Sequence, residues 1–528
     1  MSDMVSNNID ELKGAPLFKF ITSYRNIYRA IYALESYIDE LYLLGTKADR
    51  SNAKKNSTES DSQLHNKSDL ELYYILHDKY NWNVINEVIT ACQARIEDVI
   101  LKSDEYFETS VFFSLKKYDT EKEKLRFRPL HTASLVDQIC MVAMLQVLMF
   151  EDNDEIDDIP SAMPRRFPSD LLKSIPDNFY GNRGSLKLER IYEKWAPNYQ
   201  AYNQKIVESC TKYSRSHKYE YEVSLDIKEF FPSISPFYLF VKICDILKER
   251  YRNKVNKFTE SDPINSEEKI YHQNLTILKR ATAKLLFLKV KDGDKIIDPA
   301  FDYYGDEGAE PRFKDHTDLF AKGVAQGLPQ SYFFGNLCMT DVRRKIMGDD
   351  MFKGKDYFYV DDSVIYVKGY DEDLKNQFND KIKKLNKALE ELASIEELEL
   401  RWETSLKDSS DCSSLFEDLK KYCGKAIDFH KKLEDKYKIV FHEDGKSSIQ
   451  TIDVADRVIK SMGGLGRNAS GTSSIFTEGD DRRISKEKMN ALNDYAWNII
   501  KQKEQENGAH VGKTVNNDNT LQLKVFKR

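Results

Sequence analysis

Long apolar runs are missing from this chain of 528 residues. No stretch reaches the roughly 18 apolar residues that a membrane-spanning helix needs, so no transmembrane helix and no membrane partner are expected. The opening residues, MSDMVSNN, also lack the charged-then-apolar pattern of a secretory signal. These absences predict a soluble, cytoplasmic protein.

Closely spaced cysteine pairs are missing as well. The seven cysteines show no paired short spacing, which argues against a zinc site and favours reduced thiols. Most of them stand in apolar or helical contexts, where a free cysteine behaves as a core residue. No internal repeat is visible. With 32% charged and 41% hydrophobic residues, the chain has a globular composition and room for several domains.

Two adjacent carboxylates, Asp361 and Asp362, are the most informative feature present. They belong to YVDD (359–362), and apolar, aromatic and β-branched residues flank them on both sides. This pattern predicts two short strands with the carboxylates at the turn between them. Buried carboxylates are costly without a cation, and carboxylate oxygens suit Mg²⁺. An ordinary surface turn is the alternative, because Asp tolerates turn conformations.

A third carboxylate, Asp226, follows a predicted strand that begins at Tyr221. Apolar residues alternate with polar ones up to this position, and the strand is expected to pair with the YVDD strands. Asp226 could instead cap a helix. Three carboxylates brought together can hold two Mg²⁺ ions, the arrangement that activates an attacking hydroxyl in phosphoryl transfer.

The segment QGLPQS (326–331) lies between these two carboxylate segments. Gly327 and Pro329 punctuate it and an apolar run follows, which predicts a loop leading into a buried helix. Taken in order, SLDIKEFFPSI (224–234), QGLPQS and YVDD resemble motifs A, B and C of reverse transcriptases. LRFRPL (125–130) and the stretch around YGNR (180–183) are similar to bacterial members of the abortive-infection and defence-associated type.

The resemblance implies an α+β right-hand polymerase fold with fingers, a palm and a reduced thumb. It also implies a two-metal site with Mg²⁺, for which Mn²⁺ is a possible substitute. The implied metal ligands are the three carboxylates and the backbone carbonyl of Ile227. Phe231 stands where the family places an aromatic gate against a ribose 2′-hydroxyl, although core packing is the default for a Phe. Gln326 is expected near the nucleotide or the template-primer.

Further contacts follow from the same resemblance. A basic hairpin from Val111 to Leu130 corresponds to the fingers, and in that family a basic residue just before the Pro reaches the triphosphate. Arg128 is the candidate, because guanidinium binds phosphate bidentately; the rivals are Lys116, Lys117, Lys124 and Arg126. The same residues could simply protect a strand edge. Lys446 is the candidate motif D proton donor. Residues expected at the template or primer are Gly327, Pro329, Tyr359 and Gly464.

The expected domain order begins with a helical extension over 1–95 that contains a polar linker at 46–69. Fingers over 96–220 and a palm over 221–465 follow, and the palm carries insertions at 251–322 and 371–436. The second insertion is expected to hold two amphipathic helices. A thumb remnant and a flexible tail complete the chain over 466–528.

The predicted function is an RNA-directed DNA polymerase that makes cDNA from dNTPs, with an antiviral role implied by the resemblance alone. The net charge of −7 modestly favours a dedicated non-coding RNA over promiscuous duplex binding. Homo-oligomers are possible. Two alternatives stay open: a template-independent or tyrosine-primed DNA polymerase, and a catalytically silent RNA-binding scaffold. Thirty tyrosines make the first conceivable, although packing also explains them.

Overall fold

The structure, a computed structural model, describes most but not all of the chain. The described residues are 9–41, 67–79, 81–119, 124–149, 171–185, 190–255, 266–291, 303–304, 319–369, 374–390, 392, 394, 396–401, 412–443, 446–458, 460–461, 509–515 and 521–527. The expectations for most of the polar linker, for the thumb remnant and for Gly464 concern residues outside these ranges.

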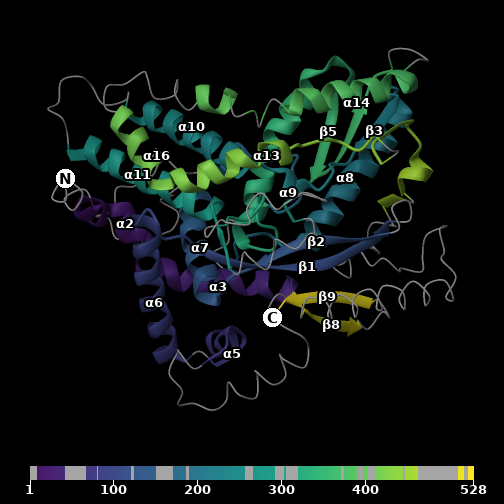
Figure 1. The fold of residues 1–528 in the computed structure, drawn as a ribbon. Helices are drawn as coiled ribbons and strands as arrows, with labels where there is room; N and C mark the ends of the chain where they lie inside the picture. Colours follow the sequence, from purple (N-terminus) through teal and green to yellow (C-terminus); the bar gives the residue numbers. More distant parts are fainter. Residues whose placement is uncertain are drawn as a thin grey trace.

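The chain folds as a mixed α+β protein (Figure 1). The helices are α2 (Pro16–Ile21), α3 (Tyr24–Leu41), α5 (Asp69–Tyr74), η2 (Ile75–Lys79), α6 (Trp82–Leu101), α7 (Leu135–Met149), η3 (Leu171–Ser174), α8 (Trp195–Ser216), α9 (Phe230–Ser233), α10 (Pro236–Val255), α11 (Ser266–Leu286), α13 (Pro329–Gly348), η4 (Asp350–Phe352), α14 (Leu374–Glu390), α16 (Cys412–Lys432) and η6 (Glu434–Lys436). The strands are β1 (Glu108–Asp119), β2 (Lys124–Thr132), β3 (Tyr221–Leu225), β4 (Lys289–Val290), β5 (Gly354–Tyr359), β6 (Asp362–Val367), β7 (Ser448–Thr451), β8 (Ala509–Val515) and β9 (Leu521–Lys527).

A four-stranded antiparallel sheet in the order β5-β6-β3-β7 carries the carboxylate segments. Tyr357, Val364 and Tyr366 on one face pack against buried residues of α8. The opposite face, which includes Phe358 and Ile365, belongs to the main hydrophobic core shared with α13 and α14. Because β6 is covered on both faces, it reads as an almost continuous apolar run instead of an alternating one.

The second sheet contains the predicted basic hairpin of β1 and β2, with β9, β8 and the short β4 added to it. Helix α7 follows β2 directly. The N-terminal helices α3 and α6 pack on α7, so this extension contributes to the same core. Helix α7 is buried on almost every side, and for this reason its sequence shows only a weak amphipathic pattern.

Helices α14 and α16, of the amphipathic kind expected, lie in the predicted second insertion, with a further helical stretch over 396–401 between them. The apolar face of α14 is buried at Phe378, Ile382, Leu385 and Leu389. The six cysteines whose side chains are described are buried and free, which confirms their assignment to the core.

Two segments of the predicted tail are strands in the structure. Strands β8 and β9 form a hairpin there, and β9 pairs with β1 at Phe113↔Val525 and Ser114↔Lys524 (Figure 1). The physical reason is that β1 leaves an edge of unpaired N–H and C=O groups, and LQLKVFK (521–527) has the alternation of a strand that can satisfy them.

Candidate carboxylate site

The sheet register brings the three carboxylates together. Strands β5 and β6 pair at Tyr359↔Asp362, so Val360 and Asp361 form the tight turn between them. Strand β3 runs antiparallel to β6 with Leu225 opposite Ser363, which places Asp226 beside Asp362. Val360 adopts a φ of 58°, a left-handed conformation that is strained for a β-branched residue. Such strain at a turn is typical of a functional site.

This proximity determines the electrostatics of the site. Burial, together with the negative charges of Asp361 and Asp226, raises the pKa of the Asp362 carboxyl to about 8. The Asp362 side chain is nevertheless exposed to solvent. Repulsion between the carboxylates does not require this side chain to be sealed from water. Three mutually repelling carboxylates form a site that favours a cation.

Two basic side chains lie beside Asp226. The Lys446 Nζ is 3.6 Å from Asp226 Oδ2 and 2.9 Å from His442 Nε2. His442 Nε2 is 3.7 Å from the same carboxylate oxygen, and the His442 backbone N–H donates to the Asp226 carbonyl at 2.9 Å. The structure therefore brings the predicted Lys446 to the carboxylates, although some 80 residues of sequence separate it from YVDD.

The donor set has the chemistry that Mg²⁺ prefers, because all three side chains offer carboxylate oxygens. Within the described residues, however, no group of three or more His, Cys, Asp or Glu side chains is close enough to hold a metal ion as it stands. Ile227, the predicted backbone ligand, is buried and pairs with Phe441 in an isolated bridge next to Asp226. The residue types fit a divalent cation, and the binding of Mg²⁺ by these residues remains a prediction.

The segment from Asn178 to Asn182 supports the YVDD turn from outside the sheet. The Tyr180 N–H donates to the Phe358 carbonyl at 2.8 Å, and the Phe358 N–H donates to the Asn178 carbonyl at 3.0 Å. A Cβ added to Gly181 would lie 2.6 Å from the Val360 nitrogen. Only glycine allows this close approach, so the Gly of YGNR positions the turn that carries Asp361.

The QGLPQS loop meets the end of β2. The His131 N–H donates to the Gln326 carbonyl at 2.7 Å, and the His131 ring contacts Tyr303 Oη at 2.9 Å. Gly327 has a φ of 109°, and a Cβ there would lie 2.6 Å from the His131 carbonyl oxygen. This loop therefore needs glycine at 327, and it ties the basic hairpin to the start of α13.

Phe231 packs beside this loop. Its ring is buried and meets Tyr332 edge-on at 6.0 Å, and the Val324 N–H donates to the Phe231 carbonyl at 2.9 Å. The Phe231 side chain thus lies between the Asp226 turn and α13, which is compatible with both the gate and the core-packing interpretations.

The remaining predicted residues are less closely tied to the carboxylates. Arg128 is half-buried and stands opposite Ser114 in the hairpin, whereas the side chains of Lys116 and Arg126 lie outside the described part. Pro329 is buried at the start of α13, and its carbonyl accepts from the Tyr192 hydroxyl at 2.6 Å. The Tyr359 ring packs on Tyr199 and Tyr202 at 4.9 and 5.5 Å.

Sequence reasoning missed His442. His442 lies only four residues before Lys446 in the sequence. Nothing in the sequence spacing showed that this segment crosses the end of β3. Only the backbone pairing of Lys228 with Val440 and of His442 with Asp226 reveals that proximity.

No protein-family model matches the chain, and no curated protein matches it at a significant level. Among the described helices, none combines the length and apolarity required to cross a bilayer.

Proposed function

We propose that the chain is an RNA-directed DNA polymerase of the right-hand type, which joins dNTPs by two-metal phosphoryl transfer. This proposal depends on one observation: Asp226, Asp361 and Asp362 lie together where strands β3, β5 and β6 of an antiparallel sheet end or begin. The antiviral role remains a proposal from the resemblance, as do the division into fingers, palm and thumb and the dedicated RNA partner.

Each side chain has a chemical part in the proposal. The three carboxylates would hold Mg²⁺, which supplies Lewis-acid activation of a hydroxyl and neutralises triphosphate charge when bound. Lys446, beside Asp226, is positioned to give a proton to the departing pyrophosphate. Arg128 would pair with phosphate oxygens. Phe231 would oppose a ribose 2′-hydroxyl by its bulk, because its buried ring packs edge-on against Tyr332.

The direct test is primer extension with Mg²⁺ and dNTPs on RNA, on DNA and without template. The variant Asp361→Asn with Asp362→Asn keeps the size of both side chains and removes two charges. We expect it to lose activity by at least about 10³-fold, the scale on which electrostatic stabilisation of a transition state contributes. The matched control is Asp380→Asn on the exposed face of α14, which should retain full activity. Equal activity of the double variant and the control would refute the carboxylate assignment.

Calorimetry separates the enzyme from a silent scaffold. An enzyme should bind a dNTP in the presence of Mg²⁺, and the same double variant should lose that binding. A scaffold would bind RNA with neither dNTP affinity nor turnover.

Priming from a tyrosine of the chain is the second candidate, and one observation favours it. Tyr199 and Tyr359 are both half-buried and their rings are in contact beside the carboxylate turn. Mass spectrometry of the reacted protein would test this candidate. A nucleotide attached to Tyr199 that disappears in Tyr199→Phe supports it, and unmodified protein that still makes DNA excludes it.

A further inference from the structure

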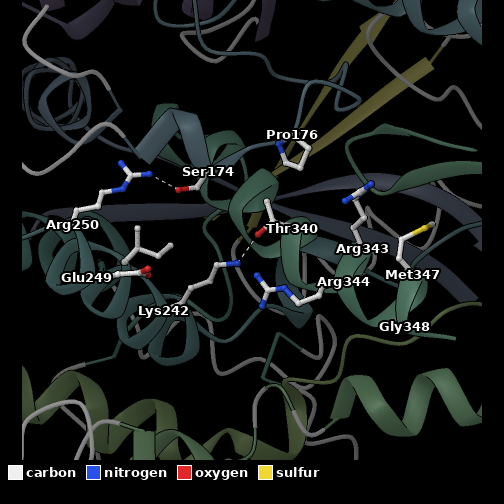
Figure 2. A pocket seen from close by; sticks show the side chains of 11 residues that line it. Ser174, Pro176, Lys242, Glu249, Arg250, Thr340, Arg343, Arg344, Met347 and Gly348 are labelled. Carbon is white, nitrogen blue, oxygen red and sulfur yellow. Dashed lines mark hydrogen bonds between the residues drawn. The ribbon is translucent and has the colours of Figure 1, made fainter. Parts of the chain in front are cut away.

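A cavity of about 770 Å³ lies between three elements that are distant in sequence (Figure 2). Its walls come from α10, from the C-terminal half of α13 and from the end of η3 with Pro176. The predicted polymerase residues are absent from its lining. It is therefore a different place from the carboxylate site, even though α13 begins at the QGLPQS loop.

Positive charge dominates the lining. Figure 2 shows cationic side chains from both helices around the cavity: Lys242, Arg250, Arg343 and Arg344. Glu249 is the carboxylate among the lining residues. Two further carboxylates, Asp341 and Asp356, lie behind the wall as ion-pair partners. The cations still outnumber the carboxylates when these are included.

Two of the cations are held rigidly. Lys242 is buried, and its Nζ donates to the Leu337 carbonyl at 2.7 Å and lies 2.8 Å from Asp341 Oδ2. Burial lowers the pKa of Lys242, and the Asp341 carboxylate opposes that shift. Arg343 is paired with the buried Asp356 of β5. Cations fixed in this way need little ordering when an anion arrives.

The other two cations are Arg344 and Arg250. Arg344 pairs with Asp341 at 3.0 Å while its side chain is 78% exposed, so this ion pair is weak. Arg250 donates from Nη2 to Ser174 Oγ at 2.8 Å (Figure 2). A guanidinium has five N–H donors in a fork that matches phosphate oxygens, so the exposed Arg344 side chain can turn to a ligand.

Apolar surface and size define the ligand further. Ile246, Met347 and Pro176 line the same cavity, and its volume falls within the roughly 300–1,000 Å³ of small-molecule sites. Cations for phosphate, an apolar surface for a base and a carboxylate for ribose hydroxyls are together the requirements of a nucleotide. We propose that this cavity binds a nucleotide through its phosphates, at a site separate from the carboxylate cluster.

The test is calorimetric titration of the full chain with ATP in the presence of EDTA. EDTA removes Mg²⁺, so the carboxylate cluster cannot hold a triphosphate and the cavity is observed alone. We expect one ATP per chain. Arg250→Ala with Arg344→Ala should weaken binding at least about tenfold, because each charge-assisted hydrogen bond contributes on the order of a factor of ten. Adenosine, which lacks phosphate, should bind at least about tenfold more weakly than ATP.

The matched control removes two exposed cations elsewhere, by Lys212→Ala with Arg215→Ala on α8, and should bind ATP like the wild type. Should the double cavity variant fail to fold, Arg344→Glu changes one exposed side chain and should weaken ATP binding in the same direction. The proposal is overturned if wild-type protein binds no ATP in EDTA, if the folded cavity variants bind it like the control, or if adenosine binds as tightly as ATP. Asp361→Asn with Asp362→Asn should retain this binding, which keeps the result independent of the proposed polymerase activity.

Discussion

Replacing Gly181 by alanine tests whether the YVDD turn is positioned from outside the sheet. The new Cβ would lie 2.6 Å from the Val360 nitrogen and 2.7 Å from its Cγ2, whereas ordinary contacts begin at 3.4 Å. The segment cannot simply move away, because Tyr180 is hydrogen-bonded to Phe358 and the Asn336 side chain donates to the Gly181 carbonyl at 2.9 Å. The turn must therefore shift by roughly 1 Å.

The expected effect on catalysis is large. A misplacement of about 1 Å near the reacting atoms can cost about 100-fold in rate, which corresponds to about 2.7 kcal/mol of barrier. Overpacking alone should cost about 1–3 kcal/mol of stability. Initial rates of dNTP incorporation and thermal unfolding should be measured together, so that a folded but slow enzyme can be recognised.

Gly424→Ala in α16 is the matched control, because a Cβ there meets nothing within 4 Å. It should stabilise the helix by about 0.5–1 kcal/mol and leave the rate unchanged. If Gly181→Ala folds normally and incorporates dNTPs as fast as Gly424→Ala, the positioning argument is refuted.

Three further predictions concern selectivity, pH and the sheet. Phe231→Val should reduce the preference for dNTP over NTP by about tenfold or more, measured as a ratio of kcat/KM values; an unchanged ratio would leave Phe231 as core packing. Burial lowers the pKa of His131 from 6.5 to about 4. As pH falls, the unfolded state therefore takes up the proton before the folded state does. The free energy of unfolding should be highest above pH 6.5 and should decline by up to about 3 kcal/mol toward pH 4. Urea unfolding of His131→Gln should show a weaker pH dependence, and an identical one would contradict this cause. Arg457→Met leaves the buried Glu222 without its ion-pair partner and should cost about 3–5 kcal/mol in the same assay; a loss below about 1 kcal/mol would show that the pair is not a net stabiliser.

The local elements were predictable because their signals are short in range. The apolar flanks of YVDD predicted the β5–β6 hairpin, the strand before Asp226 was confirmed as β3, and the Gly and Pro of QGLPQS correctly marked the loop before α13. Each rests on residues within one element, where side-chain period and turn chemistry are sufficient.

Apart from the expected pairing of β3 with β6, long-range contacts could not be predicted in the same way. The tail hairpin joins β1 across hundreds of residues, and its alternation was too short to outweigh the polar composition around it. His442 reaches Asp226 because the segment before β7 crosses the end of β3. The cationic cavity draws on helices α10 and α13, whose charged residues look like ordinary solvated faces when each helix is considered alone.

The sequence by itself determined the three acidic residues, the strands that carry them and the loop that precedes α13, because composition and periodicity act over a few neighbouring residues. Tertiary structure alone decided that Gly181 supports Val360 and that His442 meets Asp226, and it supplied the register that sets Asp226 beside Asp362. Sheet register and helix packing fix those distances, and they depend on contacts between segments that sequence spacing does not specify.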